Sequence, residues 1–287
     1  MVRTIGRALV AAAAVGFGVL AYVYLTLPDV RPLAHANPKT TAFMELRAQE
    51  AARDGKTLRH VQVWVPYSRI SPHLKRAVLV AEDDAFWQHE GIDVEQLRQS
   101  IEEDLARGAA VRGGSTITQQ LAKNLYLSPS RNPLRKIREL ILARRLEAEL
   151  TKARIFELYL NVIEWGDGIW GAEAAARTYF HTSAASLSRE QAALLAGAIV
   201  NPRVLTPAHP TARLLRRQRI ILTRMGGVEP PPVVPASEVP EPPSAAPSLA
   251  PDEEPAPAQP EPTDSGAPPQ VDPPAPPASL TPAAPAS

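Results

Sequence analysis

The chain has 287 residues and no cysteine, which excludes disulfide bonds and thiolate chemistry. Its six histidines contain no pair at the i, i+4 spacing that places two metal ligands on one helix face, which argues against a zinc site. The net charge of +1 conceals a basic body of +10 and an acidic, proline-rich end of −9, and this composition is too uneven for the whole chain to be folded.

The first element expected in chain order is a membrane-spanning helix. No charged residue occurs from position 8 to 28, and about 20 apolar residues suffice to cross a bilayer as a helix. Arg3 and Arg7 precede this run, while Tyr22 and Tyr24 lie near its far end, where an aromatic belt meets the membrane surface. The positive-inside rule therefore predicts a cytoplasmic N-terminus and a chain that lies outside the membrane after this run.

A cleaved signal peptide is the alternative, because Ala34-His35-Ala36 has the pattern of a small-x-small cleavage site. The apolar run is long for a signal peptide, and two charged residues, Asp29 and Arg31, come before that site. An anchor is therefore the favoured interpretation. Residues 29–59 are then predicted to form a linker and an exposed helix with a narrow apolar stripe, and no chemistry is assigned to them.

The body of the chain, residues 60–226, is expected to be mainly α-helical. Val61 to Val65 alternate as in a short strand, and Ser71 and Pro72 have the residue types of an N-cap and a first helical position. Residues 108–114 are small and flexible, which predicts a mobile loop over the site. Apolar periodicity and capping residues predict helices over residues 72–82, 94–107, 115–125, 133–150, 151–166, 172–179, 188–200 and 211–224.

A carboxylate cluster ends the first of these helices. Glu82, Asp83 and Asp84 are adjacent, and crowding of like charges can raise the pKa of one carboxyl group enough for proton transfer near neutral pH. Three acids at a helix end could instead simply face water. Apolar neighbours, Ala81 before the cluster and Phe86-Trp87 after it, favour a partly buried cluster. From the residues alone, a catalytic role and a solvated helix end both stay open.

A Gly-Gly pair at 113–114 precedes the next predicted helix, where free backbone N–H groups favour phosphate. Helical periodicity places Thr116, either Gln119 or Gln120, and Lys123 on one face, as a polar row that ends in a cation. This face could equally be a solvated amphipathic surface. The amide side chains add hydrogen-bonding groups suited to sugar or phosphate.

The densest basic cluster of the body follows. It consists of Arg131, Arg135, Lys136 and Arg138 together with Glu139. Arg135 and Glu139 are four residues apart, so an intrahelical ion pair accounts for part of the cluster. The remaining positive charge needs an anionic partner, for which lipid headgroups or a substrate pyrophosphate are the first candidates. Nucleic acid ranks third, because clustered aromatic residues for base stacking are lacking in the sequence.

The C-terminal segment has an unusual composition. Residues 229–287 hold 21 of the 31 prolines and nine acidic residues, with no Lys or Arg. Such a segment cannot bury enough apolar surface to offset the entropy lost on ordering, so we predict disorder with partial polyproline II character. It would serve as a spacer, as a contact segment, or as a solvated tail with no specific partner.

Five motifs in order resemble the monofunctional biosynthetic peptidoglycan transglycosylases, a family that shares its catalytic domain with bifunctional penicillin-binding proteins. The motifs are Glu82 to Phe86, Gly113 to Asn124, Arg135 to Glu139, Arg154 to Asn161 and Glu164 to Ala176. The resemblance covers roughly residues 60–226 and implies a mainly α, lysozyme-like glycosyltransferase domain with a small membrane-facing jaw lobe. The N-terminal transmembrane helix precedes this domain, and the disordered Pro-rich tail is not part of the family pattern.

By this resemblance, Glu82 is the general base that deprotonates the acceptor 4-hydroxyl. Glu139 matches the second glutamate, which helps to position the reacting groups and the leaving pyrophosphate. Phe86 and Asn161 are expected to give mainly structural support, and His89 to pack or to hydrogen-bond. The positions that match the substrate-binding set are Asp83, Phe86, Arg112, Ser115, Thr116, Gln119, Gln120, Lys123, Arg131 and Lys136.

The implied reaction is an inverting glycosyl transfer. The growing chain, held by undecaprenyl pyrophosphate, is the donor, and lipid II is the acceptor. Each step makes one β-1,4 bond and releases undecaprenyl pyrophosphate, which needs a base at one side of the sugar and cations at the other. The resemblance implies no required cofactor, although a divalent cation could accompany the substrate pyrophosphate.

The expected location is the inner membrane, with the catalytic domain in the periplasm. Further partners would come from cell-wall synthesis or division proteins, and nucleic acid is not expected. Only the Pro-rich segment follows Gly227, so we expect polymerisation without transpeptidase activity.

Two other functions remain as alternatives. A lysozyme-like lytic enzyme could use the same fold with one glutamic acid to cleave glycan. A neutral glycan strand offers no pyrophosphate to Lys123 and Arg131, which favours polymerisation. A membrane-tethered scaffold would bind headgroups through its basic body and a partner through its tail. It would leave Glu82→Gln without effect in cells that lack redundant polymerases.

Deletion of residues 229–287 is expected to leave polymerisation intact, because the tail is not part of the family pattern. The measurement compares the full chain and the truncated chain in detergent with labelled lipid II as substrate. A large loss of polymer from the truncated protein would contradict this prediction.

Overall fold

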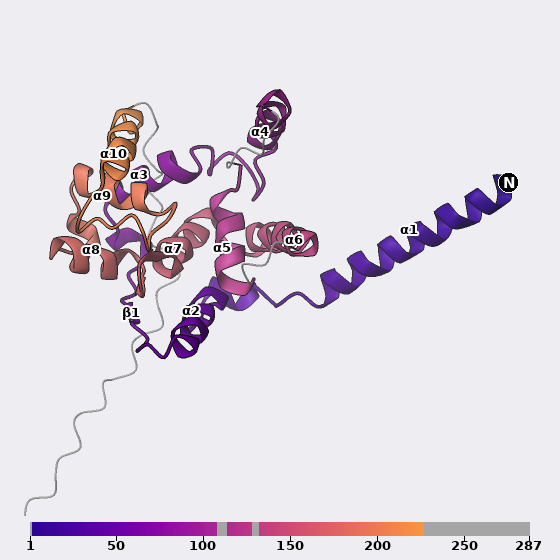
Figure 1. Cartoon of the computed structure of the whole chain (residues 1–287), viewed down its shortest axis with the longest axis horizontal. Coiled ribbons are helices and arrows are strands. Elements are labelled where there is room, and N and C mark those ends of the chain that lie inside the picture. Colours follow the sequence, from indigo (N-terminus) through magenta and orange to yellow (C-terminus); the bar gives the residue numbers. More distant parts are fainter. Residues whose placement is uncertain (1, 108–113, 128–131, 227–287) are drawn as a thin grey trace, which may run out of the picture. The chain divides into compact units, whose positions relative to one another are not determined.

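The computed structural model describes residues 2–107, 114–127 and 132–226, which are mainly helical and contain one small sheet (Figure 1). The predicted tail, most of the predicted loop at 108–114, Arg112 and Arg131 lie outside the described residues. The helices are α1 (Val2–Leu25), α2 (Ala42–Arg53), α3 (Pro72–Glu82), α4 (Val94–Arg107), α5 (Ile117–Tyr126), α6 (Pro133–Glu149), α7 (Lys152–Val162), α8 (Ala172–Phe180), α9 (Arg189–Ala198) and α10 (Ala212–Arg224). The strands are β1 (Val61–Gln62), β2 (Glu164–Gly166) and β3 (Ile169–Trp170).

Local sequence signals determine where several of these helices begin. The Ser71 hydroxyl caps α3 by accepting a backbone N–H at 3.2 Å, and Pro72 occupies the first helical position, as predicted. Thr116 caps α5 in the same way. Ser188 and Gln191 form a reciprocal capping box at the start of α9. Capping therefore explains why the predicted and observed starts of these helices agree closely.

The small sheet differs from the strand predicted at 61–65. β1 is shorter and pairs in parallel with β3, which pairs antiparallel with β2. The helix predicted over 151–166 ends at Val162, and β2 replaces its last turn. The turn between β2 and β3 requires glycine at 168, because φ is +67° and a Cβ would lie 2.1 Å from the Arg59 carbonyl oxygen. Contact with this distant segment overrides the local helical pattern.

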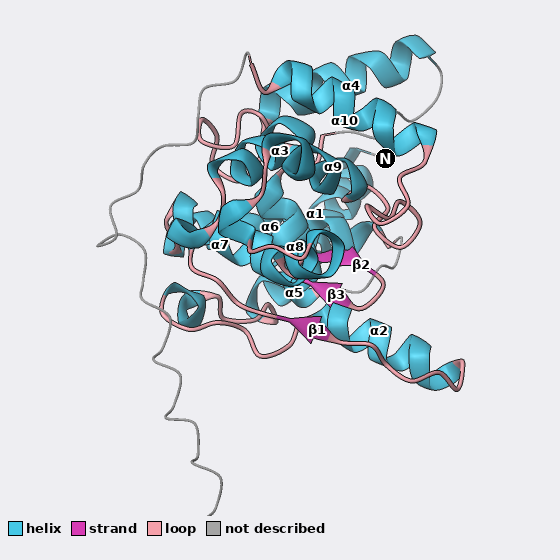
Figure 2. Cartoon of the chain, turned by 90° about the vertical axis from the view of Figure 1, so that its left-hand side faces the viewer, coloured by secondary structure: helices cyan, strands magenta, loops and turns pink. Residues whose placement is uncertain are grey.

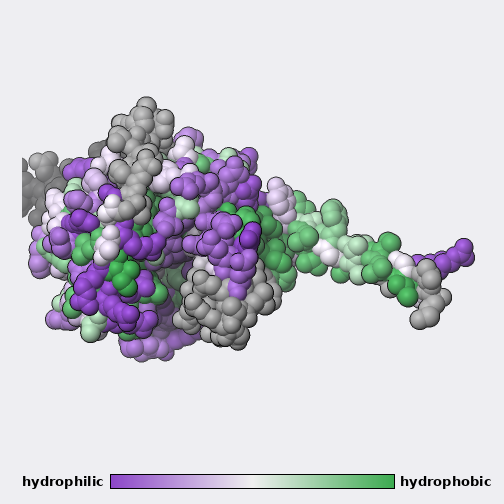
Figure 3. All heavy atoms as spheres, turned by 90° about the horizontal axis from the view of Figure 1, so that it is seen from above, coloured by the Kyte–Doolittle hydropathy of each residue, from purple (hydrophilic) through white to green (hydrophobic). Residues whose placement is uncertain are grey.

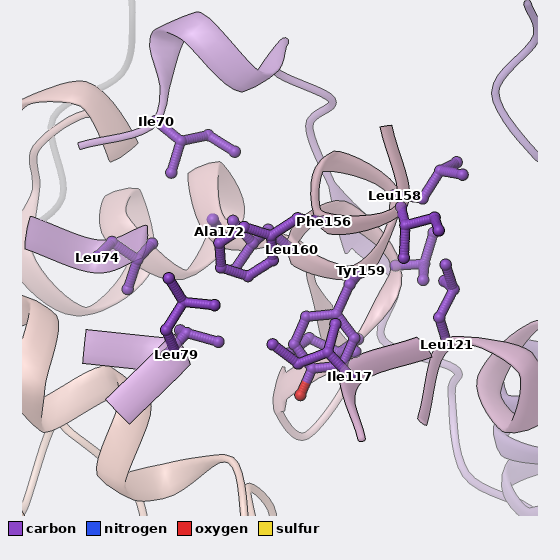
Figure 4. Packing of buried hydrophobic residues seen from close by; sticks show 14 of the residues in the cluster. Ile70, Leu74, Leu79, Ile117, Leu121, Phe156, Leu158, Tyr159, Leu160 and Ala172 are labelled. Carbon is purple, nitrogen blue, oxygen red and sulfur yellow. The ribbon is translucent and has the colours of Figure 1, made fainter. Parts of the chain in front are cut away.

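Helix α7 lies at the centre of the hydrophobic core. Its residues from Ala153 to Val162 are all buried, and Figure 4 shows Phe156 and Tyr159 among apolar side chains from other elements. A helix that is buried on all sides must be enclosed by other helices. Helices α5 and α6 pack on α7, while α3, α9 and α10 pack on one another (Figure 2).

A buried arginine ties the chain after α1 to α7. The Arg154 guanidinium donates to the carbonyl oxygens of Leu33 and Ala36 at 2.8 and 2.9 Å and pairs with the Glu157 carboxylate. A buried charge needs such partners, and here the backbone supplies two of them. This part of residues 29–59 is thus attached to the core, which differs from the predicted linker.

Helix α2 also packs against the body. Met44 is buried, and α2 contacts α5. Arg47 Nε donates to the Glu164 carboxylate of β2 at 2.9 Å, and the Glu164 side chain is only 5% exposed. These contacts differ from the exposed helix predicted here, because the narrow apolar stripe is supplemented by a partly buried ion pair.

Among the described residues, α1 is the helix that is long and apolar enough to cross a membrane. Figure 3 shows apolar side chains along it, and Phe17 is 75% exposed. Such a helix suits a lipid environment by length and composition. At its end, Arg145 of α6 lies 4.1 Å from the Tyr24 ring centroid and donates to the Tyr24 carbonyl oxygen at 2.6 Å.

Arg154→Ala is expected to lower the free energy of unfolding by about 3–5 kcal/mol, because it leaves the Glu157 carboxylate buried without its charge partner. Urea unfolding of the full chain in detergent, followed by circular dichroism, measures this loss. Arg98→Ala is the control, since Arg98 and Glu102 form an exposed pair whose removal costs roughly 0–1 kcal/mol. Equal losses in the two variants would contradict the role of Arg154.

Candidate active site

A chain of hydrogen bonds holds the side chain of Glu82, the last residue of α3. The Tyr159 hydroxyl of α7 donates to Gln120 Oε1 at 3.0 Å, and Gln120 Nε2 donates to Glu82 Oε2 at 2.9 Å. Burial raises the pKa of Tyr159 well above its usual range, which keeps the hydroxyl protonated. Because the hydroxyl donates to the amide oxygen, the amide nitrogen faces Glu82. The buried tyrosine thus sets the orientation of the glutamine.

The surroundings of Glu82 suit a base. Burial raises the pKa of Glu82, while the Gln120 hydrogen bond and the charges of Arg217 and Lys123 oppose the rise. A higher carboxyl pKa makes a stronger conjugate base, and the opposing groups favour the ionised form that can accept a proton. The side chain is half-buried, so part of it remains accessible. The predicted partly buried setting of Glu82 is therefore confirmed.

The side chain of Asp83, the residue after α3, contacts the beginning of α5. Its carboxylate accepts the backbone N–H of Ile117 at 2.9 Å and lies 3.0 Å from His89 Nε2. The sequence predicts a phosphate at this helix N-terminus. Instead, the anion at Ile117 is a buried carboxylate of the chain itself, which the helix dipole and the backbone N–H group both favour.

Thr116 and Gln119 strengthen the same junction. Thr116 is fully buried, donates to the Gly91 carbonyl oxygen at 2.7 Å and accepts the Gln119 backbone N–H. The Gln119 side chain is also buried, and its Oε1 accepts a hydrogen bond from Lys136 Nζ at 3.0 Å. Two side chains of the predicted polar row on α5 therefore stabilise the protein around the site.

A second carboxylate lies among cations on α6. Glu139 is buried, and it accepts hydrogen bonds from Arg135 Nη1 at 2.6 Å and from Lys136 Nζ at 2.5 Å. The predicted intrahelical pair of Arg135 and Glu139 is thus confirmed. Lys136 Nζ also lies 3.5 Å from the Ser115 hydroxyl oxygen. Because the Lys136 side chain is 43% exposed, its ammonium can also meet an external anion.

Lys123 lies within the electrostatic influence of both glutamates. Burial lowers the pKa of Lys123, and the negative charges of Glu139 and Glu82 oppose this effect. No carboxylate in the described part of the chain lies within ion-pair distance of its ammonium. A half-buried cation without such a partner is suited to bind a negatively charged group.

Two predicted substrate-binding residues do not present a surface to a ligand. Phe86 is 0% exposed, and its ring lies 5.4 Å from that of Phe156 in the core. Asp83 is 2% exposed and is used at the start of α5. Direct contact of either side chain with a substrate is not consistent with this burial. Phe86 packs in the core, and Asp83 binds the start of α5. Asn161, expected to support the site, is fully buried and accepts the Val65 N–H at 2.9 Å.

Sequence reasoning does not identify Tyr159 or Arg217 as parts of the site. The apolar periodicity of α7 assigns Tyr159 only to the core, and Arg217 lies in a helix to which no chemistry is assigned. A buried tyrosine hydroxyl usually forms a hydrogen bond, so a partner for Tyr159 could be expected from its buried position. The sequence does not show that this partner is Gln120. Their relation to Glu82 depends on the packing of helices that are distant in the chain.

Known proteins resemble most of this chain. The family described as transglycosylase matches residues 47–226. Biosynthetic peptidoglycan transglycosylases from Dechloromonas aromatica and Thiobacillus denitrificans are 49% and 47% identical over 204 and 229 residues. These matches cover 71% and 79% of this chain and 84% and 96% of the relatives. A protein of the same name from Aromatoleum aromaticum is 54% identical over 172 residues, which are 59% of this chain and 74% of that relative. Since the family match spans more than half of the sequence, this chain belongs to the transglycosylase family.

Proposed function

We propose that this protein polymerises the glycan chains of peptidoglycan by an inverting transfer in which Glu82 is the general base. The observation that carries the proposal is the Glu82 carboxylate, held by Gln120 and Tyr159 near the half-buried Lys123. The name of the relatives, biosynthetic peptidoglycan transglycosylase, supports this class of reaction. In our proposal, lipid II is the acceptor, and the growing chain on undecaprenyl pyrophosphate is the donor.

Glu82 would accept the proton of the acceptor 4-hydroxyl as the hydroxyl oxygen attacks the anomeric carbon of the donor. The new β-1,4 bond forms with the electron pair of that oxygen. The bond between the anomeric carbon and the pyrophosphate breaks, and its electron pair leaves with the undecaprenyl pyrophosphate. Gln120 holds Glu82 Oε2, so Oε1 is the oxygen we assign to the acceptor hydroxyl.

The cations of α5 and α6 would stabilise the charge on the leaving pyrophosphate. Lys123 and the half-exposed Lys136 are the candidates with accessible side chains, and Glu139 holds Lys136 in place. We assign the same role to Arg112 and Arg131, because the family resemblance counts both among the substrate-binding positions. Glu139 would therefore act through the cations that it positions.

We further propose that α1 anchors the chain in the cytoplasmic membrane, with the N-terminus inside and the body outside. The apolar length of α1 supports the anchor, and Arg3 and Arg7 near its N-terminus support the orientation. Val94 and Leu97 of α4 are 71% and 43% exposed, which supports a membrane-facing jaw at α4. An enzyme and a lipid-linked substrate on one surface meet at a high effective concentration.

The proposal assigns no resident cofactor to the chain. Across residues 2–107, 114–127 and 132–226, no group of three or more His, Asp or Glu side chains is arranged to hold a metal ion. That a divalent cation enters with the substrate pyrophosphate stays a prediction. Protein partners from cell-wall synthesis or division likewise stay a prediction.

Glu82→Gln is expected to reduce polymerisation by roughly 10²–10⁴-fold, because it removes the general base. The full chain in detergent is incubated with labelled lipid II, and the products are resolved by gel. Glu45→Gln is the matched control, since Glu45 is an exposed residue of α2 and is expected to leave activity unchanged.

The same experiment separates the alternative functions. Polymer from the wild type and from the control, but not from Glu82→Gln, would support the proposal. A wild type that leaves lipid II unchanged but shortens preformed glycan would favour a lytic enzyme. Inactivity of the wild type in both assays would favour a membrane-tethered scaffold.

Glu82→Gln is also expected to raise thermal stability at about pH 8, because burial disfavours the carboxylate that it removes. Since the folded-state pKa of Glu82 is raised, the folded protein loses stability as the pH rises through that pKa. The advantage of the variant should therefore be small at about pH 4, where the carboxyl group is mostly protonated, and should grow toward pH ~8. Thermal unfolding at several pH values measures it, and an advantage that does not depend on pH would contradict the prediction.

A further inference from the structure

The ammonium group of Lys123 faces an aromatic ring instead of a carboxylate. Lys123 Nζ lies 5.9 Å from the centroid of the Phe43 ring, which belongs to α2. Within the described ranges, this ammonium forms no hydrogen bond and no ion pair. A cation within about 6 Å of a ring centroid is attracted by the negative face of the ring. Phe43 therefore stabilises the charge of the half-buried Lys123.

The carboxylates near Lys123 are bound to other groups. Glu139 accepts hydrogen bonds from two cations of its own helix, and Glu82 accepts one from Gln120. Their charges act on Lys123 from beyond ion-pair distance. A carboxylate in direct contact would compete with an incoming anion for the ammonium. An aromatic ring attracts the cation without neutralising it, so the full charge remains for a pyrophosphate.

Contacts on both sides of Phe43 fix the first turn of α2. Thr41 is buried, and its hydroxyl accepts the backbone N–H of the buried Met44 at 3.2 Å. One turn after Phe43, Arg47 Nε donates to the buried Glu164 carboxylate at 2.9 Å. Helix α2 lies beside α5, the helix of Lys123 (Figure 1). The ring is thus held by a helix that is attached to the body at several points.

The chain before α2 is attached as well. The Arg154 guanidinium donates to the carbonyl oxygens of Leu33 and Ala36 and to Asn37 Oδ1, the last at 2.8 Å. Arg154 is buried, so these bonds replace those that water would otherwise form. The segment that leads from α1 to α2 therefore reaches Phe43 along a path fixed by the core.

We propose that Phe43 is a positioning residue for the reaction: the face of its ring holds the Lys123 ammonium charged and in place for the pyrophosphate of the substrate. This inference rests on the proposed function, in which Lys123 stabilises the leaving group. Phe43 lies before residues 47–226, the range that the family matches. It thus adds to the site a residue from the segment between the anchor and the catalytic domain, to which the sequence assigns no chemistry.

The test weakens the negative face of the ring while its shape is nearly kept. Phe43 is replaced by mono-, di- and trifluorinated phenylalanine, because each fluorine withdraws electron density from the ring face that attracts the cation. The same replacements at Phe17, an exposed residue of α1, are the matched control. Two quantities are measured with the full chain in detergent: kcat/KM for lipid II polymerisation and the affinity for undecaprenyl pyrophosphate, which carries no sugar.

Both quantities are expected to fall with each added fluorine, reaching roughly a two- to fivefold loss in the trifluorinated protein. Phe43→Leu should show a loss of similar size, whereas Phe43→Tyr, which keeps a ring, should stay near the wild type. In a Lys123→Met background, the affinity for undecaprenyl pyrophosphate should no longer depend on fluorination, because the cation is absent. The Phe17 series should match the wild type throughout.

Quantities that do not change with fluorination at Phe43 would overturn the inference, and so would a change in only one of the two. A fluorine dependence that persists in Lys123→Met would also overturn it, since the ring would then contact the ligand itself. Circular dichroism and thermal unfolding check folding, and the fluorine series decides even where Phe43→Leu folds poorly. A wild type that does not polymerise lipid II would instead refute the proposed function, so the two failures are distinct.

Discussion

The buried carboxylate of Asp83 joins the end of α3 to the beginning of α5, and the geometry of the site depends on this junction. Asp83 follows Glu82 in the chain and accepts the Ile117 backbone N–H at 2.9 Å, so the proposed base is held beside the helix that carries Gln120. The positive end of α5 favours this carboxylate. With this helix end occupied from inside, an external phosphate has to be met by side chains of α5 and α6 rather than by the Ile117 amide. The cationic residues Lys123 and Lys136 are suited to that task.

Two opposing demands act on Glu82. A strong base requires a raised pKa, which burial provides, but proton abstraction requires the ionised form, which burial disfavours. Gln120, Lys123 and Arg217 oppose the desolvation, and they come from two helices that are far apart in the chain. The wholly buried α7 stabilises this arrangement, since it packs against α5 and supplies the Tyr159 hydroxyl that orients Gln120. The site is therefore supported by a helix whose residues from Ala153 to Val162 are all buried.

Local signals in the sequence predict much of this architecture. The Ser71-Pro72 start and the apolar periodicity up to Glu82 predict α3 with its observed bounds, because capping and amphipathicity are local properties. The sequence predicts that backbone N–H groups at the start of α5 favour a phosphate. For the Ile117 N–H this prediction is wrong, because that group donates to Asp83. The proximity of Asp83 depends on tertiary packing, which no local pattern shows. Likewise, β2 and β3 depend on contact with the chain near Arg59, and no local pattern contains that contact. The resemblance to a known family identifies the candidate site residues, but it does not identify the buried contacts that orient them.

Helix α6 connects the proposed anchor to the cation cluster. Arg145 contacts Tyr24 at the end of α1 through its ring and its carbonyl oxygen, while Glu139 and Lys136 lie toward the other end of the same helix. Six residues separate Glu139 from Arg145, which is about 9 Å along the helix axis. With α1 in the bilayer, as proposed, the contact between Arg145 and Tyr24 holds one part of α6 beside the end of the anchor, where a lipid-linked pyrophosphate also lies.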